Sequence, residues 1–312
     1  MDYIILFLAV TCIAAQFCIN KVYQKNFAQG LKDMFFFSVV CGTVSVIIFT
    51  LLGFFINENL FQFSAFSLIM SITLAAVSSL SVLVGILIMR YGKLSVYSTF
   101  MMLGGMILPY LYGSIFLSET VSVWRIAGLV ILIFALPCSV FSPDGKSEKK
   151  EKQENKKSKI YYLLCVFIFL INGTVSIISK THSISEFAVP ATNFIVYANL
   201  WLTIINGAAY FILSRRLKNS DKQETQREIK PNKFYAVLTI AIYSTFSGLG
   251  YLFQLISAEK VDAVMLFPFV TGVTIVLSTL GARIFFKEKI SKPALAGIIL
   301  SICGTLMFLI KV

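Results

Sequence analysis

The chain has 312 residues, of which 57% are hydrophobic and 13% are charged, and its mean hydropathy is +0.83. Soluble domains are usually about 45–50% apolar and about 25% charged. The composition therefore excludes an ordinary soluble enzyme, a disordered chain and a disulfide-stapled secreted domain. The net charge of +12 is distributed between apolar segments, which argues against nucleic acid as a partner. These features predict an integral membrane protein.

Ten segments contain no Asp, Glu, Lys, Arg or His. A helix that crosses a bilayer needs about 20 apolar residues, whereas a barrel strand has about ten residues of alternating polarity. Backbone groups in lipid must be hydrogen-bonded within the segment, which favours helices. We therefore expect an all-α membrane protein with ten transmembrane helices over Tyr3–Ile19, Met34–Ile56, Ala65–Met89, Leu94–Ser118, Ile126–Ser142, Ile160–Ser179, Phe187–Ser214, Phe234–Ala258, Ala263–Ala282 and Pro293–Ile310.

Two polar linkers separate these segments. Pro143–Lys159 and Arg215–Lys233 each contain seven Lys or Arg with acidic residues among them, which is typical of solvated connectors. The first linker divides the chain into residues 1–142 and residues 160–312, each with five predicted helices. We expect two five-helix domains joined by a charged linker over residues 143–159.

The ends of the two halves are similar in sequence. Residues 115–128 (IFLSETVSVWRIAG) align without gaps on residues 284–297 (IFFKEKISKPALAG), with six identities that include Glu119/Glu288. Ser122 can cap the helix that follows it, and Glu119 lies where the positive end of that helix dipole would attract a carboxylate. This similarity predicts an internal repeat.

The basic residues predict that the two repeats have opposite orientations. The loops after the odd-numbered segments contain 23 of the 27 Lys and Arg, and the other loops and the termini contain four. The positive-inside rule places both long linkers in the cytoplasm and both termini outside. Two five-helix repeats in one chain are then inverted, which is a feature of transporters that alternate access around a central site.

The chain resembles the drug/metabolite transporters of the EamA type. The resemblance rests on Glu119 with Gly128, on Glu288 with Gly297, on Tyr97–Pro109 and on Leu266–Pro268. It implies a ten-helix transporter in which helices 1, 3, 4, 6, 8 and 9 surround the cavity and helices 5 and 10 are peripheral. It also implies cytosolic termini, which is the opposite of the charge count.

Neutral polar residues within the predicted helices are the candidates for substrate binding, since unpaired polar groups are costly in lipid. Gln16 and Asn20 share a helix face at a spacing of four, and Asn172 and Ser176 do the same in the second half. Each pair could equally well cross-link helices. The candidate set is Gln16, Asn20, Tyr97, Asn172, Ser176, Asn193, Tyr243 and Thr271.

We expect the charged residues at the segment ends to have structural roles. Glu119 and Glu288 are explained by capping, so we expect no carboxylate proton site within the membrane. Lys180 is expected to extend to the interface, and His182 to be solvated in a short loop. The six cysteines lie in apolar segments without histidine nearby, so neither a metal nor a cofactor is expected.

We therefore expect a secondary transporter of a small organic metabolite or drug-like solute, and not an enzyme. The alternatives are a polytopic membrane enzyme, which would normally carry a His, Asp or Cys cluster, and a channel-like facilitator. The expected partners are a small-molecule substrate and membrane lipid, with the chain as a monomer or a homodimer. The composition and short loops favour the plasma or inner membrane of a bacterium.

Overall fold

The computed structural model describes residues 2–27, 31–56, 62–91, 94–140, 155–218, 233–286, 292–308 and 310. Within these ranges the chain forms ten helices, which confirms the all-α fold expected from the sequence. The helices are α1 Asp2–Asn26, α2 Leu31–Phe55, α3 Ala65–Tyr91, α4 Leu94–Phe116, α5 Val123–Val140, α6 Asn155–Ser183, α7 Ala191–Lys218, α8 Lys233–Lys260, α9 Ala263–Phe286 and α10 Lys292–Met307.

Eight helices, α1 to α4 and α6 to α9, are long and apolar enough to cross a membrane. The apolar stretches of α5 and α10 are shorter, Val123–Cys138 and Lys292–Met307, and correspond to about 24 Å of helix at 1.5 Å per residue. The two short helices pack against each other. A bilayer accommodates such short spans by local thinning at modest cost.

The outer surface of the bundle is apolar, and small polar side chains lie inside. Phe55, Leu163 and Phe234 are 77%, 69% and 69% exposed, whereas Ser67 and Ser71 are fully buried. This distribution is the reverse of a water-soluble protein and suits contact with lipid.

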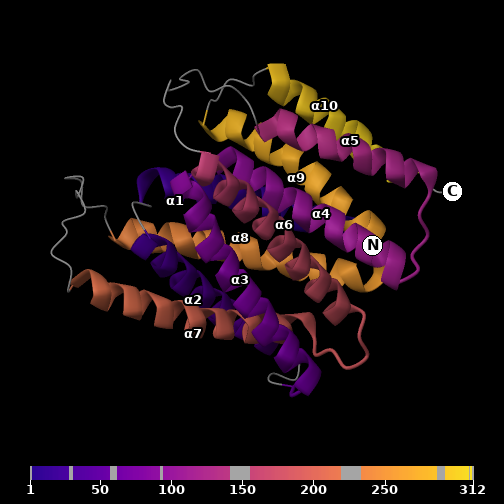
Figure 1. Cartoon of the computed structure of the whole chain (residues 1–312). Helices are drawn as coiled ribbons and strands as arrows, with labels where there is room; N and C mark the ends of the chain where they lie inside the picture. Colours follow the sequence, from indigo (N-terminus) through magenta and orange to yellow (C-terminus); the bar gives the residue numbers. More distant parts are fainter. Residues whose placement is uncertain are drawn as a thin grey trace.

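Helices of the first half pair with helices of the second half in a symmetric pattern. The helix α1 packs on α8 and α9, and its counterpart α6 packs on α3 and α4. The pairs α2/α7, α4/α9 and α5/α10 join equivalent helices of the two halves. Figure 1 shows α5 and α10 side by side at one edge of the bundle and α2 and α7 at the opposite edge. This is the arrangement of two inverted five-helix repeats around a twofold axis.

Glycines allow the closest helix approaches. A Cβ on Gly104 of α4 would collide with the backbone of Phe169 in α6. At the α5/α10 contact, a Cβ on Gly128 would lie 2.8 Å from the carbonyl oxygen of Gly304. Such contacts let membrane helices gain van der Waals packing between their backbones.

The polar linkers lie partly outside the described residues. The helix α6 begins at Asn155, so residues 155–159, the last part of the predicted linker, are helical. Likewise, α7 extends to Lys218, beyond the predicted end at Ser214. Residues 141–154 and 219–232, as well as Glu288, lie outside the described ranges.

Candidate functional site

A cavity of about 630 Å³ lies between the two halves of the bundle. Eight helices line it, α1 to α4 and α6 to α9, whereas α5 and α10 contribute no residue. The lining therefore includes α2 and α7, in addition to the six helices that the family resemblance implies. None of the lining residues within the described ranges is Asp, Glu, Lys, Arg or His. Polar contacts in the cavity come from amides, hydroxyls and backbone groups.

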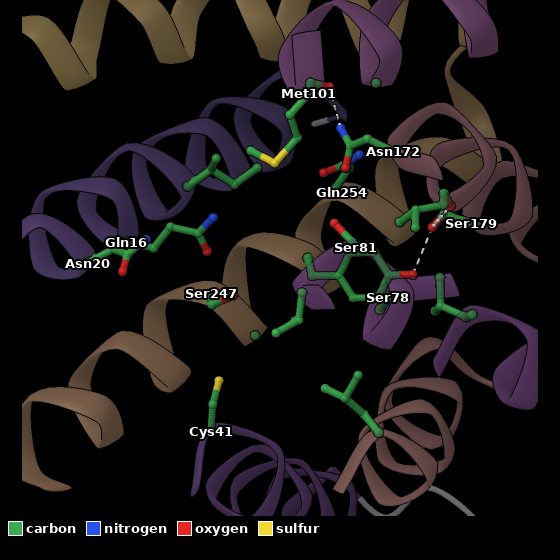
Figure 2. A pocket seen from close by; sticks show the side chains of 18 of the residues that line it. Gln16, Asn20, Cys41, Ser78, Ser81, Met101, Asn172, Ser179, Ser247 and Gln254 are labelled. Carbon is green, nitrogen blue, oxygen red and sulfur yellow. Dashed lines mark hydrogen bonds between the residues drawn. The ribbon is translucent and has the colours of Figure 1, made fainter. Parts of the chain in front are cut away.

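Six of the eight candidate residues line this cavity: Gln16, Asn20, Asn172, Ser176, Tyr243 and Thr271. Figure 2 shows Gln16 and Asn20 together on α1 with the Gln16 side chain directed into the open space. Asn193 is buried, with 3% of its surface exposed, but it does not line the cavity. The side chain of Tyr97 lies outside the described residues.

The pair on α6 bonds to the backbone of α4. The Asn172 Nδ2 donates to the carbonyl oxygen of Met101 at 2.7 Å, as Figure 2 shows. The Ser176 hydroxyl is 3.3 Å from the carbonyl oxygen of Gly105. Pro109 has no N–H to donate to that carbonyl four residues earlier, so Ser176 supplies the hydrogen bond that the proline removes. The interpretation of this pair as a helix cross-link therefore has direct contacts in its favour.

Buried charges lie directly beyond one end of the cavity. Ser179 lines the cavity and shares a hydrogen bond of 2.8 Å with the Tyr251 hydroxyl. The next residue, Lys180, is 4% exposed, and its ammonium donates to the carbonyl oxygens of Ala258 and Val261 at 2.8 and 2.7 Å. Lys180 therefore binds the carbonyl-rich C-terminus of α8, where a cation is favoured. The sequence predicted that Lys180 would extend to the interface, and this prediction is wrong.

Glu119 binds the start of α9. Its carboxylate oxygens accept hydrogen bonds from the backbone N–H groups of Ala263 and Val264 at 2.9 and 2.8 Å. The same carboxylate is 3.7 Å from the Lys180 ammonium. The sequence predicted a capping role for Glu119, but at the next helix, α5; the structure places it on a helix of the other half. We call Glu119, Lys180 and the α8–α9 turn the buried ion-pair cluster.

Two local features direct the Glu119 side chain to α9. Ser118 has a φ of 53°, a left-handed conformation that ends α4 and turns the chain. A Cβ on Gly113 would collide with the Glu119 carboxylate, so only glycine leaves room there. Ser122 caps α5 as expected, since it accepts a 3.3 Å hydrogen bond from the Arg125 N–H.

His182 is not solvated, which corrects the expectation from the sequence. It is 2% exposed, stacks on Phe194 with ring centroids 3.7 Å apart, and shares a 3.0 Å hydrogen bond with the Ser67 hydroxyl. The sequence gives no direct signal for this, because the helix was expected to end at Ser179. Together with Lys180, His182 shows that α6 continues for one more turn inside the bundle.

Other lining residues were not among the candidates. Tyr251, Gln254 and Thr274 lie on the same polar stripes as Tyr243 and Thr271, so helical periodicity was an available signal for them. The hydroxyls and thiol of α2 and α3 carried no comparable signal, because small polar side chains in membrane helices usually bond to their own backbone. These residues are Ser38, Cys41, Ser45, Ser78 and Ser81.

Comparison with known families identifies the second half of the chain. Residues 159–310 match the model of the EamA-like transporter family. The second half belongs to that family. EamA-like proteins are membrane transporters of the drug/metabolite superfamily, so by its second half the chain is similar to transporters of small molecules.

A solved structure shares the fold of this chain over nearly its whole length. That structure, described as "Crystal structure of protein", aligns with a TM-score of 0.74 and 13% identity, over 98% of this chain and 95% of the other. The likeness includes the first half, which the family model does not cover. No curated protein matches the chain.

Proposed function

We propose that this chain is a secondary transporter that moves a small organic solute without net charge by alternating access. The moving parts are the two repeats, residues 1–142 and 160–312, joined by the linker over residues 143–159. The observation that carries the proposal is a cavity of about 630 Å³ that lies between helices of both repeats and has no charged side chain among its described lining residues. Its size suits a drug-sized ligand.

The lack of charge in the lining favours a neutral or internally compensated substrate. An ion that enters such a cavity loses its hydration without gaining a counter-ion, which is expensive in an apolar environment. Within the described lining no carboxylate is present to bind a proton in exchange for substrate. Glu119 lies outside the cavity, and two backbone N–H groups and Lys180 already occupy its oxygens. We therefore expect facilitated transport or exchange in place of proton antiport through a carboxylate.

The buried ion-pair cluster is a good candidate for the closed gate of this conformation. It joins the end of α4 and the end of α6 to the turn between α8 and α9, at the end of the cavity marked by Ser179. Opening the cavity on that side requires these helix ends to separate. The hydrogen bonds of Lys180 and Glu119 must then be exchanged for water or other partners.

We place the gate on the outer side of a bacterial plasma or inner membrane, with the long linkers in the cytoplasm and the termini outside. The support is the count of 23 to four Lys and Arg. Arg125 and Lys180 are two of the four basic residues on the side predicted to be outside. Arg125 is 3.7 Å from the Asp262 carboxylate, and Lys180 is paired with Glu119. The eight helices that line the cavity all belong to one chain, which favours a monomer as the transporting unit.

The proposal is tested by comparing metabolites inside and outside cells that overproduce the protein with cells that carry an empty vector. A cavity-filling variant, Ser247→Trp, serves as the inactive form, because Ser247 lines the cavity. Ile204→Trp is the matched control, since Ile204 is 50% exposed on the lipid-facing surface. We expect a small set of uncharged compounds to change sides with wild type and Ile204→Trp but not with Ser247→Trp. If all three inserted proteins leave the metabolites unchanged, the proposal is wrong.

A further inference from the structure

The two halves of the cavity contain equivalent polar positions. A shift of 156 residues places Gln16 of α1 on Asn172 of α6, and a shift of 169 places Gly105 of α4 on Thr274 of α9. The helix pairs agree, because α6 packs on α4 and α1 packs on α9. Gln16 with Thr274 is therefore the counterpart of Asn172 with Gly105.

On the α6/α4 side, the amide is hydrogen-bonded to the neighbouring helix. The Asn172 amide donates to the carbonyl oxygen of Met101 at 2.7 Å. A Cβ on Gly105 would lie 2.5 Å from the Asn172 Nδ2, so the amide fills the space above the glycine. This pair holds two helices together, with the Asn172 nitrogen bonded to the α4 backbone.

The α1/α9 pair is unsatisfied. The Gln16 Oε1 and the Thr274 Oγ1 are both buried and have no hydrogen-bond partner among the described residues. Thr274 is 2% exposed, and both residues line the cavity. Helical threonines commonly donate to the carbonyl four residues earlier, as Thr174 and Thr245 do here. A buried polar atom without a partner is costly, so this pair is a candidate for contact with a bound molecule.

We propose that Gln16 and Thr274 determine substrate specificity by binding an uncharged carboxamide. A substrate N–H would donate to the Gln16 Oε1, and the Thr274 hydroxyl would donate to the substrate carbonyl. Phe17 and Phe267 line the same cavity and offer apolar surface to the rest of the molecule. The inference rests on the proposed function in one respect, since it takes this cavity as the substrate site.

Four probes with one phenylpropyl body and different head groups test the inference. They are 3-phenylpropanamide, its donor-free ester methyl 3-phenylpropanoate, the anion 3-phenylpropanoate and the cation 3-phenylpropylammonium. Binding to the full chain in lipid nanodiscs is measured by ligand-detected NMR titration. We expect the amide to bind about threefold to tenfold more tightly than the ester, which is the range of a net neutral hydrogen bond, and both ions to bind more weakly than the ester.

The variant Gln16→Met should reduce binding of the amide to the level of the ester and leave the ester unchanged. Thr274→Val removes the donor to a carbonyl that both probes carry, so it should weaken amide and ester alike. Equal binding of amide and ester to wild type, tighter binding of either ion, an unaltered amide preference in Gln16→Met, or unaltered binding of both probes to Thr274→Val would overturn the inference.

Thermal unfolding separates a binding role from a structural one. Thr274→Val and Gln16→Met remove unpaired polar atoms, so their melting temperatures should equal or exceed that of wild type. Asn172→Leu removes a formed hydrogen bond and should melt lower. A fall in both α1/α9 variants as large as that of Asn172→Leu would assign them a structural role instead. Selective amide binding without any metabolite movement in cells would support the inference while contradicting the transport proposal.

Discussion

The helix pairs α4/α6 and α1/α9 occupy equivalent places in the two halves, but they differ in how their polar groups are used. In α4/α6, Asn172 and Ser176 bond to carbonyl oxygens of Met101 and Gly105, and Gly104 brings the two backbones together. In α1/α9, the Gln16 Oε1 and the Thr274 Oγ1 have no partner among the described residues. The first pair is hydrogen-bonded between its helices, whereas the second has unsatisfied buried atoms on residues that line the cavity.

This difference shows that an inverted repeat fixes where residues lie and not what they do. The twofold relation makes the position of Gln16 on α1 equivalent to that of Asn172 on α6, and both residues carry an amide. Whether that amide bonds to the neighbouring helix depends on what the helix offers there. Asn172 lies over Gly105 of α4, and the position on α9 equivalent to Gly105 is Thr274. If the comparison is correct, substitutions on the α4/α6 side should lower stability, and substitutions on the α1/α9 side should alter ligand recognition.

The largest loss of stability is expected from substituting Lys180, which joins the end of α6 to the turn between α8 and α9. Lys180→Met leaves the Glu119 carboxylate buried without its cation, and removing one partner of a buried ion pair typically costs about 3–5 kcal/mol. We expect a large drop in the melting temperature of the purified protein. Glu186→Gln is the matched control, because Glu186 is exposed, and a surface substitution of this kind changes stability by only about 0.5 kcal/mol.

The double variant Glu119→Gln/Lys180→Met makes the test specific to the ion pair. Two residues in contact are not additive, so the double variant should lose less stability than the sum of the single variants. Additive losses would mean that the 3.7 Å contact between Glu119 and Lys180 contributes nothing, and that each residue acts only as a helix cap.

A smaller effect is expected at the glycine that joins α4 to α6. Gly104→Ala places a methyl group against the backbone of Phe169, and such overpacking typically costs about 1–3 kcal/mol. Gly207→Ala on α7 is the control, because a Cβ there meets nothing within 4 Å. It should be neutral or stabilising by up to about 1 kcal/mol, the difference in helix propensity. Equal melting temperatures for the two variants would show that the backbones of α4 and α6 do not approach closely at Gly104.

The sequence was sufficient to predict the ten helices and to name six of the residues that line the cavity. Charge-free apolar segments locate membrane helices, because lipid excludes charges and requires internally bonded backbone. Polar stripes on those helices placed residues such as Tyr243 and Thr271 at the cavity, since an unpaired polar group rarely faces lipid. Charge-based boundaries failed at α6, where Lys180 and His182 lie inside the helix end.

The remaining features depend on contacts between residues distant in sequence. Glu119 reaches Ala263 across 144 positions, and His182 reaches Ser67 across 115, so no local pattern reveals either contact. Capping rules gave Glu119 the correct chemistry but the wrong helix, because they consider only the next helix in the chain. Similarly, the equivalent positions of Gln16 and Asn172 could not reveal that the Asn172 Nδ2 is bonded to α4 while the Gln16 Oε1 has no partner among the described residues.

The third prediction concerns the bonded amide itself. Asn172→Leu removes the hydrogen bond to Met101, and polar contacts between membrane helices contribute about 0.6 kcal/mol on average and up to about 1.7 kcal/mol. We expect a modest fall in melting temperature. Binding of 3-phenylpropanamide should stay close to wild type, since Asn172 already has its partner. A loss of amide binding at unchanged stability would reverse the roles that we assign to the two helix pairs.

The smallest effect is expected at Ser176, and its origin can be isolated. Ser176→Ala leaves the Gly105 carbonyl without the donor that replaces the missing N–H of Pro109. The expected loss is about 0.5 kcal/mol, the low end for a neutral hydrogen bond, because the contact is long at 3.3 Å.

In a Pro109→Ala background the residue at position 109 again has an N–H that can bond to this carbonyl. The same Ser176→Ala change should then have no effect on the melting temperature. A loss of equal size in both backgrounds would mean that Ser176 stabilises α6 through its other contact, the carbonyl oxygen of Asn172 at 3.3 Å, and not the proline-interrupted helix α4.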